Sequence, residues 1–278
     1  GHTLPFDSVV PCNIGNPQEV GQSPISFPRQ VIALTLCPSL LEDPQIGKIF
    51  PEDAIERARE YLKEIPNGTG AYSHSKGVSI VRNEVAKFVE QRDGGHSADP
   101  EDIFLTDGAS PAVQMVLNMV INSANAGVMI PIPQYPLYSA AIKMLGGRQV
   151  DYFLDESAAW GTPRSELERS LYSAREQGVD VRALAVINPG NPTGQCLDVP
   201  QMEDIVQFCD EEGLVLMADE VYQENVYGAE PFRSFRRIAH EEGLLGDDAD
   251  DAGGEKGLQL VSFHSLSKVT DPSSLPPS

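Results

Sequence analysis

From residue 102 onward, the chain alternates between short apolar runs and longer segments with helical spacing of apolar side chains. Six runs predict strands: DIFLTDG (102–108), GVMIPIPQY (127–135), RQVDYFLD (148–155), VRALAVINP (181–189), LVLMADEVY (214–222) and LQLVSFHS (258–265). Segments at 110–124, 136–145, 163–177 and 199–213 predict helices between them. Such alternation is typical of crossover connections, so we expect an α/β protein with a mostly parallel sheet in a three-layer arrangement.

The segments flanking these runs carry ordinary signals for helices and loops. Ser110 as cap with Pro111 in first position predicts the start of one helix, and Gly213 predicts the end of another. Before residue 102, residues 1–50 are rich in Pro, Gly and Asn and predict an irregular arm. Residues 51–65 have helical spacing.

Composition excludes several classes of function. The net charge of −21 argues against nucleic-acid binding, and no apolar run approaches the roughly 20 residues of a membrane helix. The glycine-rich, acidic stretch at 241–257 is typical of a solvated loop. The four cysteines form no CxxC pair and no histidine pair has metal-ligand spacing, so we expect no metal site. Four cysteines in a chain of this length suggest reduced thiols, which are typical of an intracellular protein, cytoplasmic or mitochondrial.

Chemistry-bearing residues follow the predicted strands at their carboxyl ends, where open α/β sheets bind ligands. TDGAS leads into a helix and could bind a phosphate, although an ordinary helix cap also explains it. Tyr135 could stack on a flat ring or pack in the core. NPGNPTG presents Asn191 from a stretch that excludes regular structure. Asp219 ends an apolar strand, which costs free energy unless the carboxylate meets a cation, and Lys268 follows the last strand.

A phosphate cradle, a stacking aromatic, an amide, a buried carboxylate and a lysine together are the groups that bind pyridoxal 5'-phosphate (PLP). The phrases NPGNPTGQ, ADEVYQENVY and SFHSLSK resemble the fold-type-I, class I/II aminotransferases. NIGNPQEVGQ, GAYSHSKG, LTDGAS and IPIPQYPLYSA indicate the alanine aminotransferase branch. The resemblance extends over essentially the whole chain up to Lys268.

The resemblance implies a role for each matching residue. Lys268 would form the covalent link to PLP and move the proton between substrate and cofactor. Asp219 would pair with the ring nitrogen. The other expected contacts are Asn191 and Tyr222 to the phenolic oxygen, Tyr135 to the ring face, Ala109, Ser110 and Ser265 to the phosphate, Tyr72 to the phosphate in the neighbouring subunit of a homodimer, and Gly15 with Asn191 to the substrate.

The resemblance also implies the domain organisation. Residues 1–65 would form an N-terminal arm and part of a small domain, and 66–268 would form the PLP-binding large domain. After Lys268 the family continues with a glycine-rich stretch and an arginine that contacts the phosphate, whereas this sequence reads VTDPSSLPPS. We therefore expect a sheet that is incomplete at its C-terminal end and a disordered segment at 269–278.

Three functions compete at this point. The first is transamination between L-alanine and 2-oxoglutarate, with small amino acids and 2-oxo acids as the partners. The second is another fold-type-I reaction, such as that of a lyase or a synthase. The third is an inactive, shortened aminotransferase, for which we expect weak PLP binding and no measurable transamination by the 278-residue chain.

Overall fold

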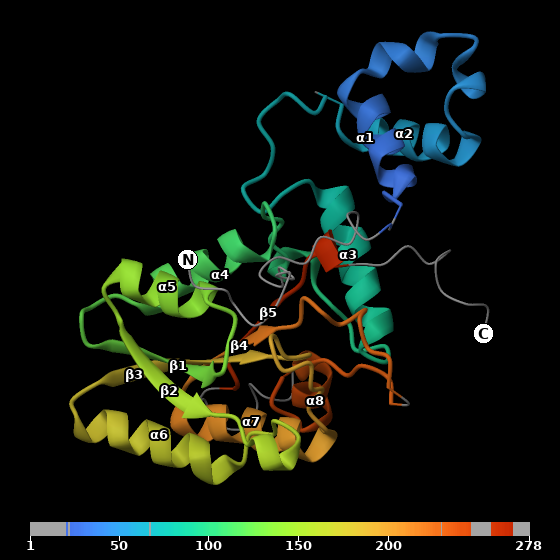
Figure 1. The fold of residues 1–278 in the computed structure, drawn as a ribbon. Coiled ribbons are helices and arrows are strands. Elements are labelled where there is room, and N and C mark those ends of the chain that lie inside the picture. The colour runs from blue at the N-terminus through green and yellow to red at the C-terminus, as the bar shows by residue number, and fades with distance from the viewer. Residues whose placement is uncertain (1–20, 22, 67, 229, 246–256, 269–278) are drawn as a thin grey trace, which may run out of the picture. The chain divides into compact units, whose positions relative to one another are not determined.

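The computed structural model describes residues 21, 23–66, 68–228, 230–245 and 257–268 (Figure 1). Gly15, residues 246–256 of the acidic stretch and the segment 269–278 lie outside the described residues. The chain divides into two compact units, residues 1–73 and 74–278. No helix in the described part of the chain is long and apolar enough to cross a membrane.

The first unit is helical. It contains α1 (Ser26–Leu36), two 3₁₀ helices (Pro38–Glu42 and Ile46–Lys48) and α2 (Glu52–Glu64). Helix α2 agrees with the helix predicted at 51–65, but α1 corrects the expectation of an irregular arm over 1–50. Helix α1 has no side-chain cap, and it packs Val31 and Leu34 against Ile55 of α2. Packing against another helix stabilises a short segment whose local signals are weak, which explains why the sequence pattern missed it.

The second unit is a three-layer α/β structure, as predicted. Its elements are α3 (Ser79–Arg92), α4 (Ala109–Val120), β1 (Ala126–Ile132), α5 (Leu137–Leu145), β2 (Arg148–Phe153), α6 (Arg164–Glu176), β3 (Asp180–Ile187), α7 (Val199–Glu212), β4 (Val215–Asp219), α8 (Phe235–Glu241) and β5 (Leu260–Phe263), with short 3₁₀ helices at Pro100–Asp102, Glu156–Ala158 and Leu266–Lys268. The five strands lie in the order β2-β1-β3-β4-β5, and every neighbouring pair is parallel.

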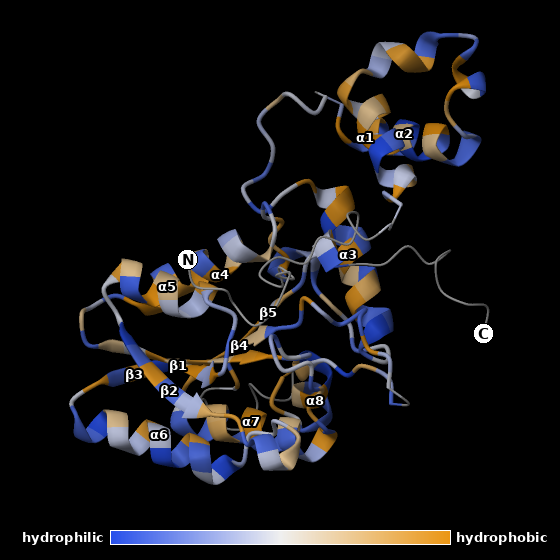
Figure 2. Cartoon of the chain, in the orientation of Figure 1, coloured by the Kyte–Doolittle hydropathy of each residue, from blue (hydrophilic) through white to orange (hydrophobic). Residues whose placement is uncertain are grey.

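The sheet separates two apolar cores. On β3, Leu184 and Val186 face the core formed with α6, α7 and α8, whereas Ala183, Ala185 and Ile187 face the core formed with α4 and α5. Strand β1 is buried along nearly its whole length, but β2, at the edge of the sheet, alternates buried and exposed residues. In Figure 2 the central strands are mainly in the orange of hydrophobic residues, whereas β2 also carries hydrophilic blue. Burial on both faces explains the continuous apolar runs of the central strands.

Two local expectations need correction. Helix α4 begins at Ala109 with Gly108 as its N-cap, so Ser110 is its second residue and not its cap. Residues 103–106 join no strand in the described structure, although a strand was predicted at 102–108. The backbone N–H of Leu105 donates to the carbonyl of Lys76 at 2.9 Å. An apolar run becomes a strand only where a neighbouring strand pairs with its backbone, and none of the described strands pairs with this segment.

Helix α7 shows how local signals place an element near the site. Asp198 accepts a hydrogen bond from the backbone of Gln201, whose side chain accepts one in return from the N–H of Asp198. This reciprocal cap begins the helix, and Gly213, with φ of 67°, ends it. The connection between β3 and α7 therefore occupies residues 188–198, and it contains Asn191.

Candidate functional site

The loop after β3 folds around its own asparagines and glycines. Asn188 is buried, and its side-chain oxygen accepts a hydrogen bond from the N–H of Leu197 at 3.0 Å. The N–H of Gly190 donates to the carbonyl of Gln195 at 2.8 Å. A Cβ at Gly190 would lie 2.1 Å from the end of the Gln195 side chain, so a larger residue there would have to displace that side chain. These contacts close the loop and leave Asn191 at its tip.

Asp219, the last residue of β4, is the buried carboxylate of this sheet edge. Its side chain accepts hydrogen bonds from the hydroxyl of Tyr138 at 2.9 Å and from the N–H of Val221 at 3.4 Å. Asp219 is 7% exposed, and among the described residues no arginine or lysine forms an ion pair with it. Burial raises the pKa of the Asp219 carboxyl, and the Tyr138 hydrogen bond opposes that shift.

Tyr222 contacts two other residues that were predicted for the site. Its hydroxyl accepts a hydrogen bond from Nδ2 of Asn191 at 3.2 Å, and Nζ of Lys268 lies 5.6 Å from its ring centroid. Burial raises the pKa of the Tyr222 phenol, and the nearby Asp219 and Tyr135 add to that shift. The structure thus brings Tyr135, Asn191, Asp219, Tyr222 and Lys268 together at the carboxyl ends of the parallel strands.

The predicted phosphate ligands lie on α4 and after β5. Gly108 adopts φ of 97° and caps α4 without a side-chain hydrogen bond, so the first-turn N–H groups at Ala109 and Ser110 are open to an anion. Helix α4 contacts β5, and Ser265 follows that strand. The Ser265 hydroxyl lies 2.9 Å from the hydroxyl of Ser267 and accepts the Ser267 N–H at 3.2 Å.

Two residues predicted for the site are not among those that the structure brings together. Tyr72 is fully exposed and belongs to the first compact unit. Gly15 lies outside the described residues. Their roles toward a neighbouring subunit and toward substrate therefore remain predictions.

Tyr138 is a site residue that sequence reasoning missed. It is fully buried in α5, three residues after Tyr135, and its hydroxyl donates to Asp219. A buried tyrosine hydroxyl needs a partner, but the sequence does not identify that partner, because Tyr138 and Asp219 are 81 residues apart.

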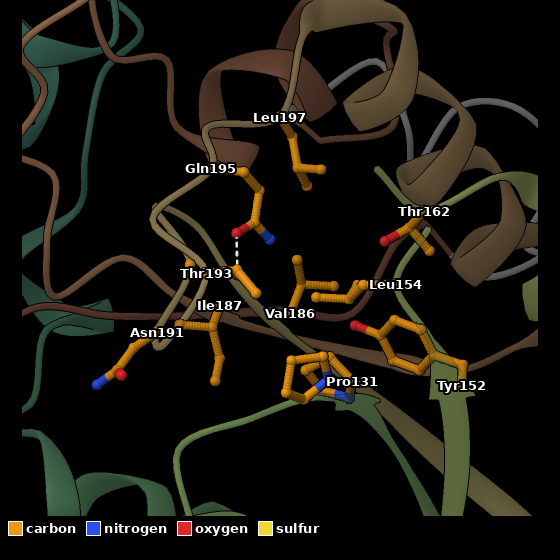
Figure 3. Close-up of a pocket in the computed structure, with 12 residues that line it drawn as sticks. Pro131, Tyr152, Leu154, Thr162, Val186, Ile187, Asn191, Thr193, Gln195 and Leu197 are labelled. Carbon is orange, nitrogen blue, oxygen red and sulfur yellow. Dashed lines mark hydrogen bonds between the residues drawn. The ribbon is translucent and has the colours of Figure 1, made fainter. Parts of the chain in front are cut away.

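A small cavity lies behind the Asn191 loop. Its lining includes Tyr152, Thr162, Thr193 and Gln195, and its volume is about 10 Å³. Figure 3 shows the amide of Asn191 pointing away from the space that the other labelled side chains enclose. A cavity of this volume has room for about one water molecule and not for a cofactor. The Asn191 amide therefore does not line the inside of this cavity, and it donates its hydrogen bond to Tyr222 instead.

The residues present fit PLP. A buried carboxylate that is not paired with a cation among the described residues is expensive, and a protonated ring nitrogen would supply the missing positive charge. The open N-terminus of α4 suits the phosphate, and the Asn191–Tyr222 pair supplies donors for an oxygen on the ring. No cluster of three or more metal-ligating side chains occurs in the described part of the chain.

Glu220, next to Asp219, is fully buried, and its pKa differs from that of an ordinary glutamate. Burial raises the pKa of its carboxyl to about 7, against the opposing effect of Arg92. Between pH 4.5 and 7 the folded protein holds a proton that the unfolded chain has released. This contribution to stability is complete below about pH 4.5 and is lost as the pH rises toward 7.

Glu220→Gln is therefore expected to change the pH dependence of stability. The free energy of unfolding of the wild-type protein should lose about 3 kcal/mol from this one group between pH 4.5 and 7. The variant should lack that loss, because an amide does not titrate and its oxygen can still accept the Phe235 N–H. Urea unfolding at several pH values measures the free energy of unfolding of both proteins. The difference between the two at each pH reports on Glu220, because the histidines titrate in both proteins and their contribution cancels. An identical pH dependence in the two proteins would show that Glu220 does not titrate in this range.

Comparisons with known proteins identify the family of this chain. The model of the family "Aminotransferase class I and II" matches residues 43–269. A probable mitochondrial alanine aminotransferase of Dictyostelium discoideum is 53% identical over 268 residues, 96% of this chain and 48% of that protein. Mitochondrial alanine aminotransferase 1 of Arabidopsis thaliana is 52% identical over 95% of this chain and 47% of its own length. Glutamate–glyoxylate aminotransferase 1 of the same plant is 51% identical over 92% of this chain and 52% of its own length.

Solved structures show the same fold. An Escherichia coli aminotransferase aligns with a TM-score of 0.68 at 23% identity, over 96% of this chain and 53% of that one. An alanine aminotransferase from Pyrococcus furiosus aligns with a TM-score of 0.59 at 23% identity, over 75% of this chain and 47% of that one. The chain spans about half the length of the curated relatives it matches. Its match to the family model over most of its length shows that it belongs to the class I and II aminotransferases.

Proposed function

We propose that this protein is a PLP-dependent aminotransferase that moves the amino group of L-alanine to 2-oxoglutarate, giving pyruvate and L-glutamate. The observation that carries the proposal is the buried Asp219 carboxylate, which has no cationic partner among the described residues and lies near Tyr222, the residue that contacts Asn191 and Lys268. The names of the alanine aminotransferases at 52–53% identity support the choice of substrates.

Bound PLP supplies an electron sink that stabilises negative charge on the α-carbon of the amino acid. The Lys268 amine would hold the cofactor covalently and would carry the proton to and from the α-carbon. The Asp219 carboxylate would keep a proton on the ring nitrogen. Asn191 and Tyr222 would donate hydrogen bonds to the phenolic oxygen, and Tyr135 would pack against the ring.

The phosphate would bind at the N-terminus of α4, with Ala109, Ser110 and Ser265 as ligands. In a homodimer, Tyr72 would reach the phosphate of the partner subunit, and Gly15 with Asn191 would contact the substrate. These assignments follow the family resemblance. We further propose an intracellular location, cytoplasmic or mitochondrial, since the relatives at 52–53% identity are named as mitochondrial enzymes.

A second pair of substrates has specific support. Two Arabidopsis thaliana relatives at 51% identity are named glutamate–glyoxylate aminotransferases, so L-glutamate and glyoxylate form the alternative. The relatives at 47–53% identity are named as aminotransferases, which does not favour a lyase or a synthase.

Two measurements on the purified full-length protein test the proposal. In the first, PLP is added, the protein is reduced with borohydride and the labelled peptide is mapped. The label should lie on Lys268, and a label on the exposed Lys143 of α5 would contradict the assignment. In the second, coupled assays compare L-alanine with 2-oxoglutarate and L-glutamate with glyoxylate. A higher kcat/KM for the second pair would replace the proposed substrates while keeping the reaction class.

A further inference from the structure

The turn after β4 presents its side chains in two directions. Asp219 and Tyr222 belong to the candidate site, whereas Glu220 and Gln223 contact Arg92, at the end of α3. Nη1 of Arg92 donates to Oε1 of Gln223 at 2.9 Å and lies 3.6 Å from Oε2 of Glu220. Glu220 is 0% and Gln223 4% exposed, so both contacts lie inside the protein. A single guanidinium therefore holds both ends of the short turn that contains Tyr222 and directly follows Asp219.

Other contacts tie the same turn to its neighbours. The Glu220 N–H donates to the carbonyl of Phe263 on β5 at 3.0 Å, and Oε1 of Glu220 accepts the N–H of Phe235 on α8 at 2.7 Å. The Gln223 N–H donates to the carbonyl of Glu220 at 3.0 Å, which closes the turn. Arg92 adds the contacts from α3, so that the turn is held from three elements.

Arg92 is itself held in one orientation. Its Nε and Nη2 donate to the two carboxylate oxygens of Asp93 at 2.7 and 3.0 Å. Asp93 is 0% exposed and also accepts hydrogen bonds from Ser234 at 2.7 Å and from Arg236 at 3.0 Å. A bidentate pair fixes the plane of a guanidinium, which leaves Nη1 directed at the turn.

We propose that Arg92 is a positioning residue for the cofactor site, because it fixes the turn that orients Asp219 and Tyr222. The proposal rests on the proposed function, in which those two residues contact PLP. Arg92 acts through its contacts with Glu220 and Gln223. Neither its charge nor its hydrogen bonds are assigned to PLP or substrate.

The chain offers a matched control. Arg236 also pairs with Asp93, but among the described residues its other hydrogen bonds go to the carbonyls of His96 and Ser97 and not to the turn. Arg92→Met and Arg236→Met each remove one cation from Asp93, so both should lower the melting temperature. Only Arg92→Met should also loosen the turn at 220–223, because, of these two arginines, only Arg92 contacts Glu220 and Gln223. Gln223→Met removes the acceptor on the turn and keeps the Arg92–Asp93 pair, so it serves if Arg92→Met does not fold.

The test combines amide hydrogen exchange with PLP titration. In Arg92→Met, amides at 220–223 should exchange faster, and the Kd for PLP should rise at least about tenfold. Gln223→Met should also speed the exchange at 220–223 and raise the Kd, but by less. Arg236→Met should leave the exchange rates and the Kd near their wild-type values. Unchanged exchange at 220–223 in Arg92→Met and Gln223→Met would overturn the proposal, as would faster exchange with an unchanged Kd. If the wild-type protein takes up no PLP, the proposed function fails, and exchange alone then decides whether Arg92 holds the turn.

Discussion

Replacement of Lys268 by alanine is expected to lower kcat for transamination by about ten-thousandfold or more, since in the proposed function this one residue supplies both the covalent link and the proton transfer. Nζ of Lys268 lies over the ring of Tyr222, whose hydroxyl accepts a hydrogen bond from Asn191. The variant should also lose PLP fixation by borohydride. Steady-state kinetics and mass spectrometry of the reduced protein measure the two effects.

Lys143→Ala is the matched control for that variant. Lys143 lies in the last turn of α5 and is exposed. Its removal should leave the kinetics and the labelling near wild type. If Lys268→Ala kept a tenth or more of the wild-type kcat, Lys268 would be neither the covalent anchor nor the proton carrier.

Asp219→Asn is expected to lower kcat by about a thousandfold, which is the cost typical of removing one preorganised electrostatic contact. An amide has nearly the shape of the carboxylate and can still accept the Tyr138 hydroxyl, but it carries no charge to keep the ring nitrogen protonated. A neutral ring is a weaker electron sink, so the loss should appear in kcat more than in the KM for either substrate.

The same substitution should have the opposite effect on the protein without cofactor. Asp219 is 7% exposed and is not paired with a cation among the described residues, so its charge costs free energy until a positive partner arrives. Thermal melts of the cofactor-free protein should show Asp219→Asn to be at least as stable as wild type. Added PLP should then stabilise the wild type more than the variant. A variant that turns over at a near-normal rate would contradict the pairing of Asp219 with the ring nitrogen.

Much of the fold could be predicted from periodicity. The predicted strands at 127–135, 148–155, 181–189, 214–222 and 258–265 overlap β1 to β5, because strands buried on both faces of a parallel sheet form continuous apolar runs. The run at 102–108 also contains consecutive apolar residues but forms no strand among the described residues. Composition reports that a segment is apolar, and pairing depends on whether another strand lies beside it. Helix α1 shows the converse, since its stability comes from packing against α2.

The sequence by itself determined the candidate residues of the site, because strand ends carry binding groups and the phrases around Asn191, Asp219 and Lys268 are specific. Only the tertiary structure decided which contacts they make. The partner of Asp219 is Tyr138, 81 residues away, and the partner of Gln223 is Arg92, 131 residues away. Residues so far apart in the chain meet only when the sheet and its helices assemble. Burial, which raises the pKa of Asp219 and Glu220, arises from the same assembly.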